Sequence, residues 1–223
     1  KTHRMRMKKI KNILISQPRP LSDRNPYADL ETSFGVQCDF QQLIRVEGVG
    51  IREFRDQHIY FEEYTAVIVS SRLGIDHFFR LCEEMRYTVP DTMKYFCVSE
   101  KIASYLQKYI QYRKRKVFFP SVETNKVEEL LPQSKRHSDE KYLVAVSDVN
   151  KDTLIPLLEE NKITCARAAF YKTVSADIAQ GKPFDYDMVT FFSPEGIPSL
   201  KKNYPNFEQG EVVIAALGAK TAK

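Results

Sequence analysis

Short apolar runs alternate with amphipathic stretches along most of the chain. The short runs predict buried strands, which we expect at residues 12–15, 66–69, 95–98, 117–119, 142–146, 188–192 and 212–216. Helical spacing of apolar residues predicts helices at residues 75–82, 102–109 and 153–158. Pro156 fits the last of these only in its first turn. This alternation is typical of βα units around mostly parallel sheets.

An internal repeat is the strongest pattern in the sequence. The motif S-x-x-G-I follows a predicted strand at residues 71–75 and again at residues 193–197. Two further pairs of segments match: residues 98–103 with 217–222, and residues 15–17 with 146–148. Ordered matches at similar spacing indicate a duplicated half, so we predict two similar α/β lobes.

Two extended segments, residues 40–46 and 165–174, suggest how the lobes are connected. If both are crossing strands, the first lobe consists of residues 1–43 and 173–223, and the second lobe, residues 44–172, is inserted between them. The sequence stops at Lys223, in a predicted helix that has barely begun, whereas a closed lobe needs further βα structure. We therefore expect a C-terminal segment beyond this sequence.

The composition favours one class of ligand but does not identify the function. The chain has 223 residues, of which 43% are hydrophobic, and a formal net charge of +5 that favours an anionic ligand. The basic run within residues 108–116 raises nucleic-acid binding as an alternative, but it is more typical of a solvated helix end. The sequence contains no dinucleotide-binding, P-loop or nucleophile-elbow motif.

The four cysteines and four histidines are scattered along the chain, and no C-x-x-C pair occurs. This distribution predicts reduced thiols and no metal site. The apolar runs are too short to span a membrane, and the basic N-terminus lacks the apolar part of a secretory signal. We expect a cytoplasmic, monomeric protein with no cofactor and with neither nucleic acid nor a membrane as partner.

Small polar residues follow the predicted strands, at Ser16, Ser71, Ser99, Ser147, Ser193, Gly218 and Thr221. Ligands of parallel α/β sheets bind beyond the carboxyl ends of the strands, where N–H groups of helix N-termini attract anions. Serine is also an ordinary helix N-cap, which is the competing interpretation for each position. Matching polar loops on two facing lobes would form a cleft that suits a ligand rich in carboxylates.

Tyr171 is a candidate for chemistry because it lies in the second predicted crossing strand, where alternate side chains would face that cleft. A phenol with a pKa near ~10 stays protonated at neutral pH and donates a proton or a hydrogen bond. Packing explains an aromatic residue in a strand equally well. The residues alone leave both interpretations of Tyr171 open.

Several of these segments resemble motifs of one known family. Residues 191–197 read FFSPEGI and residues 215–222 read AALGAKTA, which resemble the paired f-S-P-s-g and a-i-G-x-x-T-a motifs of uroporphyrinogen-III synthases. Residues 169–173, AFYKT, are similar to the v-Y-x-t segment of that family, and residues 69–72, VSSR, extend the match. The resemblance covers nearly the whole chain in order.

The resemblance implies an α/β fold with two flavodoxin-like lobes that contain parallel sheets and are joined by a two-stranded connection. It also implies the reaction, in which linear hydroxymethylbilane loses water and cyclises with its last pyrrole ring inverted, without metal or organic cofactor. By position, Tyr171 becomes the candidate general acid. Candidate ligands of the substrate carboxylates are Thr221, Gly218, Ser193 and Ser71, joined by the strand-end residues Ser99 and Ser147.

Two positions depart from the family pattern. The first loop reads SQPRP at residues 16–20 where many members have t-R-P, so Arg19 replaces that arginine only if the loop is rearranged. The counterpart of Thr221 in the other half is Ile102, which has no side-chain hydrogen-bonding group, and this leaves the contact to Ser99. These departures keep an alternative open: a non-catalytic two-lobed protein of the same fold that binds a small anion or a tetrapyrrole.

Overall fold

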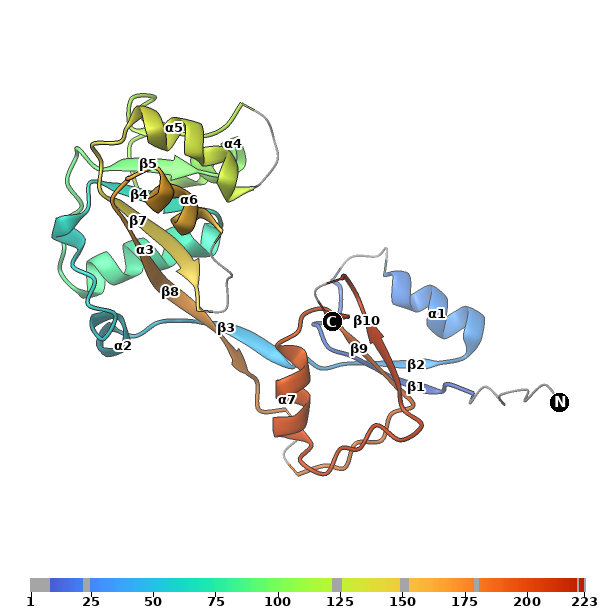
Figure 1. Ribbon diagram of the computed structural model, residues 1–223. Coiled ribbons are helices and arrows are strands. Elements are labelled where there is room, and N and C mark those ends of the chain that lie inside the picture. The colour runs from blue at the N-terminus through green and yellow to red at the C-terminus, as the bar shows by residue number, and fades with distance from the viewer. Residues whose placement is uncertain are drawn as a thin grey trace. The chain divides into compact units, whose positions relative to one another are not determined.

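The computed structural model describes residues 9–21, 25–121, 126–148, 153–178, 181–219 and 221–222. The chain forms two compact units (Figure 1). Unit 1 consists of Lys1–Arg45 together with Thr173–Lys223, and unit 2 consists of Val46–Lys172. Unit 2 is therefore inserted into the sequence of unit 1.

The larger sheet has the strand order β3-β8-β7-β4-β5-β6 (Figure 1). Its strands are β3 Ile44–Gly48, β4 Ala66–Val69, β5 Lys94–Cys97, β6 Val117–Phe118, β7 Tyr142–Ser147 and β8 Cys165–Ser175. Every neighbouring pair from β8 to β6 is parallel. The carboxyl ends of these strands consequently lie at one edge of the sheet.

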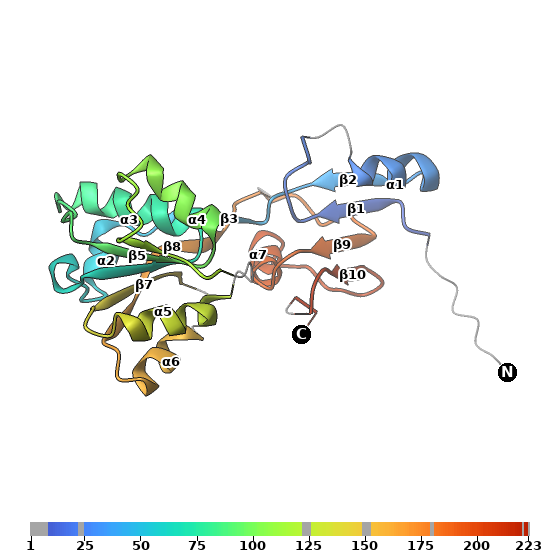
Figure 2. The ribbon, with the colours of Figure 1, turned by 90° about the horizontal axis from the view of Figure 1, so that it is seen from above.

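Helices cover both faces of this sheet, with α3 and α4 on one face and α5 and α6 on the other (Figure 2). The helices of unit 2 are α2 Ile51–Arg55, α3 Arg72–Glu84, α4 Glu100–Tyr105, α5 Leu131–Arg136 and α6 Leu154–Glu160, with 3-10 turns at Phe61–Glu63, Leu106–Lys108 and Val127–Leu130. Alternation along β4 divides the core, because Val67 and Val69 pack in the cluster that contains the buried residues of α3. Ala66 and Ile68 pack in the other cluster, which contains the buried residues of α6.

Helix α3 begins at a well-formed cap and has one apolar face. The Oγ of Ser71 accepts a hydrogen bond from the backbone N–H of Gly74 at 3.0 Å, which satisfies a donor of the first turn. Ile75, Phe78 and Leu81 are at most 1% exposed. Burial of each such side chain stabilises the fold by about 1.5–3 kcal/mol, so packing as well as the cap fixes Ser71 at the end of β4.

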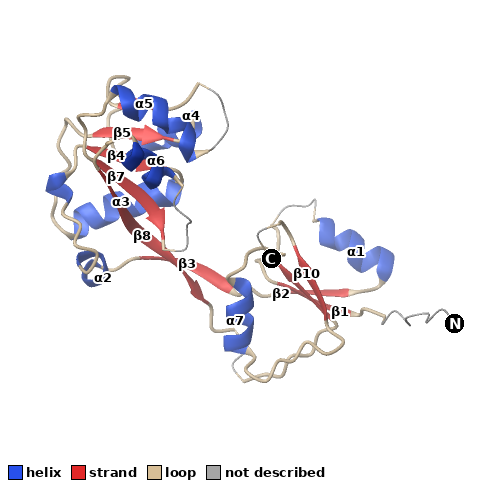
Figure 3. Cartoon of the chain, viewed as in Figure 1, coloured by secondary structure: helices blue, strands red, loops and turns tan. Residues whose placement is uncertain are grey.

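Unit 1 is built on a four-stranded parallel sheet with the order β10-β9-β1-β2. Its strands are β1 Asn12–Ile15, β2 Gln37–Phe40, β9 Met188–Phe191 and β10 Val213–Ala216, and its helices are α1 Pro26–Phe34 and α7 Gly196–Asn203 (Figure 3). Leu200 of α7 packs on Leu14 and Val189, whereas Tyr27 of α1 packs on the cluster of Ile13 and Ile15. The two helices therefore cover opposite faces of this sheet.

Two strands carry the chain between the units. The N–H of Val49 donates to the carbonyl of Phe170 at 3.0 Å, and the N–H of Ala176 donates to the carbonyl of Leu43 at 2.8 Å. Residue numbers rise along one segment while they fall along the other, so β3 and β8 are antiparallel. The unit boundaries fall inside these strands. The predicted fold class is confirmed, because the α/β chain has two parallel sheets and a two-stranded connection.

The two sheets have corresponding strand orders. The order β10-β9-β1-β2 of unit 1 matches β5-β4-β7-β8 of unit 2. In both units the three matching sequence segments follow corresponding strands, β9 and β4, β10 and β5, and β1 and β7. Counted along the chain from β1, the order of unit 1 reads 2-1-3-4, which is how flavodoxin-like sheets begin. In unit 2 the spatial order is the same, but β4 and β5 precede β7 in the chain.

The predicted elements agree with the structure except at some boundaries. All seven predicted strands are present, and the predicted helix at residues 75–82 lies inside α3. The predicted helix at residues 102–109 is divided between α4 and the 3-10 turn Leu106–Lys108. The predicted extended segment at residues 40–46 covers the end of β2 at Phe40 and the start of the crossing strand β3 at Ile44, and the segment at residues 165–174 lies within β8.

Candidate active site

Four candidate residues lie at or near the carboxyl ends of four adjacent strands in unit 2. Ser99 follows β5, Ser71 follows β4, Ser147 is the last residue of β7, and Tyr171 lies in β8. The strands are neighbours in the order β5-β4-β7-β8. Ser147 and Tyr171 are also register partners, beside an irregularity in the pairing of β7 with β8. Polar side chains from distant parts of the sequence are thus gathered at one edge of the sheet.

Ser71 and Tyr171 are in direct contact. Their hydroxyl oxygens are 3.1 Å apart, and either hydroxyl is able to donate the hydrogen bond. The Ser71 Oγ also accepts from the N–H of Gly74 at the start of α3. Ser71 therefore connects the positive end of a thirteen-residue helix to the phenol of Tyr171.

The ring of Tyr171 is held by a histidine that the sequence did not suggest as a site residue. The imidazole of His77 stacks on the Tyr171 ring, with centroids 5.8 Å apart and planes inclined by 26°. Arg80 Nε donates to His77 Nδ1 at 3.1 Å, and Arg80 Nη2 donates to the carbonyl of Val49 at 2.7 Å. We call Ser71, His77, Arg80 and Tyr171 the Tyr171 cluster.

Gly48, at the end of β3, packs closely against this cluster. A Cβ atom at Gly48 would lie 2.7 Å from Arg80 Nη2 and 2.8 Å from His77 Nδ1. Only a residue without a side chain fits there unless Arg80 and His77 move. The position of the crossing strand is therefore linked to that of the Tyr171 ring.

The electrostatic surroundings keep His77 neutral. Burial lowers the pKa of His77 below its usual value, and the positive charge of Arg80 lowers it further. Arginine has only donors, so the acceptor at Nδ1 places the proton of the neutral ring on Nε2. The phenol of Tyr171 therefore stacks on an uncharged ring.

Ser99 and Ser147 are 4% and 5% exposed. Ser99 precedes α4 without a side-chain hydrogen bond to the helix, and the carbonyl of Ser147 accepts from Arg167 Nη2 at 2.8 Å. Within the described residues, neither hydroxyl has a hydrogen-bond partner. Both hydroxyls are therefore available to a ligand at this edge.

In unit 1 the remaining candidates also follow the strands. Ser193 follows β9, and Gly218 follows β10 with φ of 93°, a conformation that favours glycine. Thr221 is 7% exposed, and its N–H donates to the carbonyl of Gly218 at 3.1 Å. Arg19 is largely exposed, 3.8 Å from a carboxylate oxygen of Glu31. The structure shows no hydrogen bond among the side chains of these four residues within its described parts.

Comparison with known families identifies the chain. Residues 28–223 match the family described as uroporphyrinogen-III synthase HemD. The chain belongs to the uroporphyrinogen-III synthase family. No curated protein sequence matches it.

Solved structures of uroporphyrinogen-III synthases have the same fold. The enzyme from Helicobacter pylori superposes with a TM-score of 0.57 at 15% identity, with 96% of this chain and 86% of that chain covered. A mutant enzyme from the extremely thermophilic bacterium Thermus thermophilus gives a TM-score of 0.51 at 14% identity, with 95% and 86% covered. At such identities the likeness supports the fold, and the roles of individual residues need separate evidence.

Other kinds of site are not apparent in the described parts of this uroporphyrinogen-III synthase family member. Its four cysteines form no disulfide. No group of three or more His, Cys, Asp or Glu side chains is placed to hold a metal ion within the described ranges. No helix among the described residues is long and apolar enough to cross a membrane.

The sequence therefore predicted part of the Tyr171 cluster. Ser71 and Tyr171 were both named, and the structure brings them together. His77 and Arg80 were missed because the histidines look scattered in the sequence. One signal was present: Ser71, Gly74 and His77 are spaced by three residues, which places them near one another on a helix surface.

Proposed function

We propose that the chain cyclises hydroxymethylbilane to uroporphyrinogen III with loss of water, and that Tyr171 is the general acid of this reaction. Membership of the synthase family supports the activity. The observation that carries the assignment of Tyr171 is the 3.1 Å contact between its hydroxyl and Ser71 at the carboxyl edge of the sheet. The enzyme is accordingly a lyase of tetrapyrrole and haem biosynthesis.

Tyr171 acts on the hydroxyl group that leaves the substrate. The phenol donates its proton as the carbon–oxygen bond breaks, so the hydroxyl departs as water, while electrons of the attached pyrrole stabilise the carbon centre. Positioned proton transfer of this kind accelerates a reaction by roughly 10²–10⁴-fold. The phenol must point its proton toward the substrate at this moment.

Ser71 leaves that proton free if it acts as the donor to the oxygen of Tyr171. One acceptor site of Ser71 is occupied by the N–H of Gly74, and the hydroxyl proton of Ser71 is then directed to Tyr171. The same hydrogen bond stabilises the negative charge that develops on the phenol oxygen. Ser71 thus positions the acid.

His77 and Arg80 are positioning residues for Tyr171. His77 covers one face of the Tyr171 ring, and Arg80 fixes the imidazole through Nδ1. Because burial and Arg80 lower the pKa of His77, its ring stacks on the phenol without adding a charge. This arrangement suits a reaction in which geometry, more than acid strength, selects the product.

The remaining candidates bind the carboxylates of the substrate. We assign this role to Ser99 and Ser147 in unit 2 and to Ser193, Gly218, Thr221 and Arg19 in unit 1. The free hydroxyls of Ser99 and Ser147, within the described residues, support it. Arg19 is exposed and has one carboxylate nearby, so it is accessible to an anion.

A product analysis tests the activity. Hydroxymethylbilane closes without enzyme to the uninverted isomer, so purified protein is mixed with freshly generated substrate and the isomers are separated. We expect the inverted isomer to predominate. Only the uninverted isomer, formed at the rate without protein, would contradict the proposal. Thermal stabilisation by the tetrapyrrole without conversion would point instead to a non-catalytic binding protein.

We further propose that the enzyme works as a monomer in the cytoplasm and without nucleic acid. The mild net charge of +5 supports the last point. Light scattering of the purified chain measures its oligomeric state, and a titration with an oligonucleotide at rising salt tests for electrostatic binding. A dimer, or affinity that falls steeply with salt, would contradict the corresponding point.

A further inference from the structure

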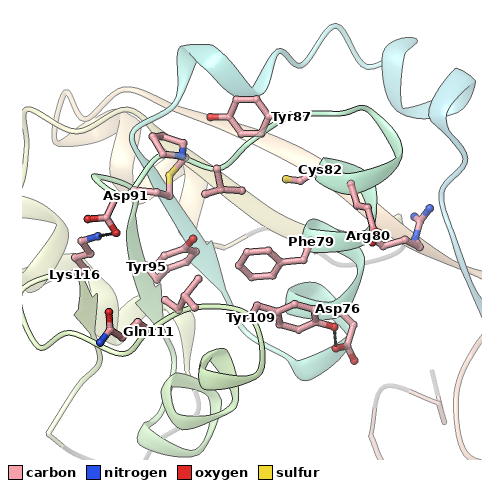
Figure 4. Close-up of a pocket in the computed structure, with 15 residues that line it drawn as sticks. Asp76, Phe79, Arg80, Cys82, Tyr87, Asp91, Tyr95, Tyr109, Gln111 and Lys116 are labelled. Atoms are coloured by element: carbon pink, nitrogen blue, oxygen red, sulfur yellow. Dashed lines mark hydrogen bonds and ion pairs between the residues drawn. The ribbon is translucent and has the colours of Figure 1, made fainter.

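Unit 2 contains a pocket that is separate from the Tyr171 cluster in all but one residue, Arg80. Its volume is about 580 Å³, within the range of about 300–1,000 Å³ that is usual for small-molecule sites. Figure 4 shows that residues of α3, β5 and the segments beside β5 and β6 line it. None of the site residues predicted from the sequence is among them.

The walls of the pocket are rich in aromatic rings. Phe79 stacks on Tyr109 with ring centroids 4.4 Å apart and planes inclined by 6°. Tyr95 lies next to Phe79 at 6.2 Å with an inclination of 29°. Val89 and Met93 add aliphatic and thioether surface. Rings held in this way present flat surfaces that suit another flat ring.

The hydroxyl of Tyr95 is the polar group that marks the pocket as a binding site. Tyr95 is 2% exposed, and Figure 4 shows its hydroxyl directed into the pocket. Within the described residues this hydroxyl has no hydrogen-bond partner. Burial raises the pKa of Tyr95, so the group stays a neutral phenol. An acceptor atom of a ligand in the pocket is therefore able to take the hydrogen bond that this hydroxyl does not make within the described residues.

The charged side chains around the pocket are already compensated by one another. The pairs are Asp91 with Lys116, Asp76 with Lys108, and Arg80 with Glu84. The other charged lining residue, Glu83, is exposed to solvent. A charged ligand would have to displace one of these pairs, whereas a neutral ligand leaves them intact.

We propose that this pocket binds a neutral, flat molecule of one or two aromatic rings that accepts a hydrogen bond from the hydroxyl of Tyr95. The ring lies against Phe79 and Tyr95, and the acceptor atom faces the phenol. Such a ligand differs in charge and shape from a flexible polycarboxylate. The pocket is therefore a second binding site, and it does not depend on the proposed synthase activity.

A pair of matched probes tests the proposal on the whole chain. Isoquinoline has two fused rings and one acceptor nitrogen, and naphthalene has the same shape without the acceptor. Both are titrated into protein with ¹³C-labelled methionine methyl groups. Met93 lines the pocket, whereas Met188 lies in β9 of unit 1 and serves as an internal control.

We expect isoquinoline to shift the Met93 methyl signal with a Kd on the order of 1 mM or tighter, and Met188 to stay unchanged. Naphthalene should bind at least about fivefold more weakly, because it offers no acceptor. The absence of a Met93 shift at about 5 mM isoquinoline, or equal affinities for the two probes, would overturn the proposal.

Variants identify the group that discriminates between the probes. Tyr95→Phe should weaken isoquinoline about fivefold and leave naphthalene unchanged, whereas Tyr60→Phe, at a tyrosine 56% exposed and outside the pocket, should change neither. Val89→Trp should fill the pocket and abolish binding of both. If Tyr95→Phe fails to fold, the affinities of the wild-type chain for isoquinoline and naphthalene still test the proposal. Unchanged isoquinoline affinity in folded Tyr95→Phe would overturn the proposal.

Discussion

The two units have corresponding strand orders, but they hold their strand-end serines differently. In unit 2, Ser71 caps α3 and contacts Tyr171. In unit 1, Ser193 stands at the corresponding place, yet α7 begins after Glu195 and has no side-chain cap. The same S-x-x-G-I sequence therefore gives a fixed hydroxyl in one unit and not in the other.

The partner strands explain part of this difference. β8 has eleven residues; it pairs with β7 as far as Tyr171, which lies opposite Ser147, and continues to Ser175. The corresponding strand of unit 1, β2, has four residues and ends at Phe40. Duplication thus supplies two similar scaffolds, and Tyr171 lies on β8 of unit 2 opposite the last residue of β7. We infer that the proposed general acid belongs to unit 2.

The largest expected effect is that of Tyr171→Phe. This change removes the acidic hydroxyl but keeps the ring that stacks on His77. We expect formation of the inverted isomer to slow about 100-fold, with little change in the free energy of unfolding. Initial rates with freshly generated substrate measure the effect, and Tyr60→Phe serves as a control at an exposed tyrosine. An unchanged rate would remove Tyr171 from the mechanism.

The glycines of the repeated motif give the next comparison. A Cβ at Gly196 would lie 2.9 Å from the ring of Phe191, which is 1% exposed. A Cβ at Gly74 would lie 3.3 Å from the Ser71 Oγ. We expect Gly196→Ala to lower the free energy of unfolding by about 1–3 kcal/mol.

Gly74→Ala should instead act mainly on the reaction. The alanine gains up to about 1 kcal/mol of helix propensity, which offsets the crowding, but it displaces the hydroxyl that contacts Tyr171. Urea unfolding and isomer analysis of both variants separate the two effects. Equal losses of stability in the two variants, together with a wild-type reaction rate in Gly74→Ala, would contradict the expected difference between the two glycines.

Truncation of the two serines tests the caps directly. Ser71→Ala removes a formed N-cap and should cost about 1 kcal/mol of stability. Ser193→Ala removes a hydroxyl that caps nothing in the structure and should cost no more than a few tenths of a kcal/mol. The urea midpoints of the two variants, measured side by side, compare the two losses of stability. Equal losses of stability would show that both serines cap their helices.

The sequence predicted the scaffold because buried parallel strands are apolar and repeated. Helix α1 was missed although its signals were present: Asn25 caps the helix, Pro26 opens it, and Gly35 ends it with φ of 62°. β2 was missed because it is short and interrupted by polar residues, Gln37 and Asp39. The break between β2 and β3 reflects long-range contacts, since the carbonyl of Leu43 accepts from Ala176 N and from Ser199 Oγ.

The candidate site was predictable only where chain order alone determines position. Ser71, Ser99 and Ser147 end strands, so their place at the edge of a parallel sheet follows from the βα pattern. The contact between His77 and Tyr171 depends on the register of β8, which no local pattern determines. Long-range pairing therefore decided the part of the site that the sequence did not reveal.

The smallest expected effect is a pH dependence of stability that arises from His77 in unit 2. Burial, and then the charge of Arg80, lower the pKa of His77 in the folded chain, while an unfolded histidine has a pKa near ~6.5. The other charged groups near it, Asp76 and Glu84, act in the opposite direction but do not reverse the shift. The unfolded chain therefore binds a proton at His77 more readily than the folded chain does. The contribution of His77 to the free energy of unfolding is lost as the pH falls below the pKa of the unfolded histidine.

His77→Gln removes this titration while it keeps a polar side chain of similar length. Between about pH 7.5 and about pH 5.5, the urea midpoint of the wild-type chain should fall more than that of His77→Gln. Other groups titrate in both proteins, so the difference between the two curves isolates His77. Parallel curves would mean that the proton affinity of His77 is the same in the folded and unfolded chains, and that Arg80 does not hold the imidazole against Tyr171 as the geometry indicates.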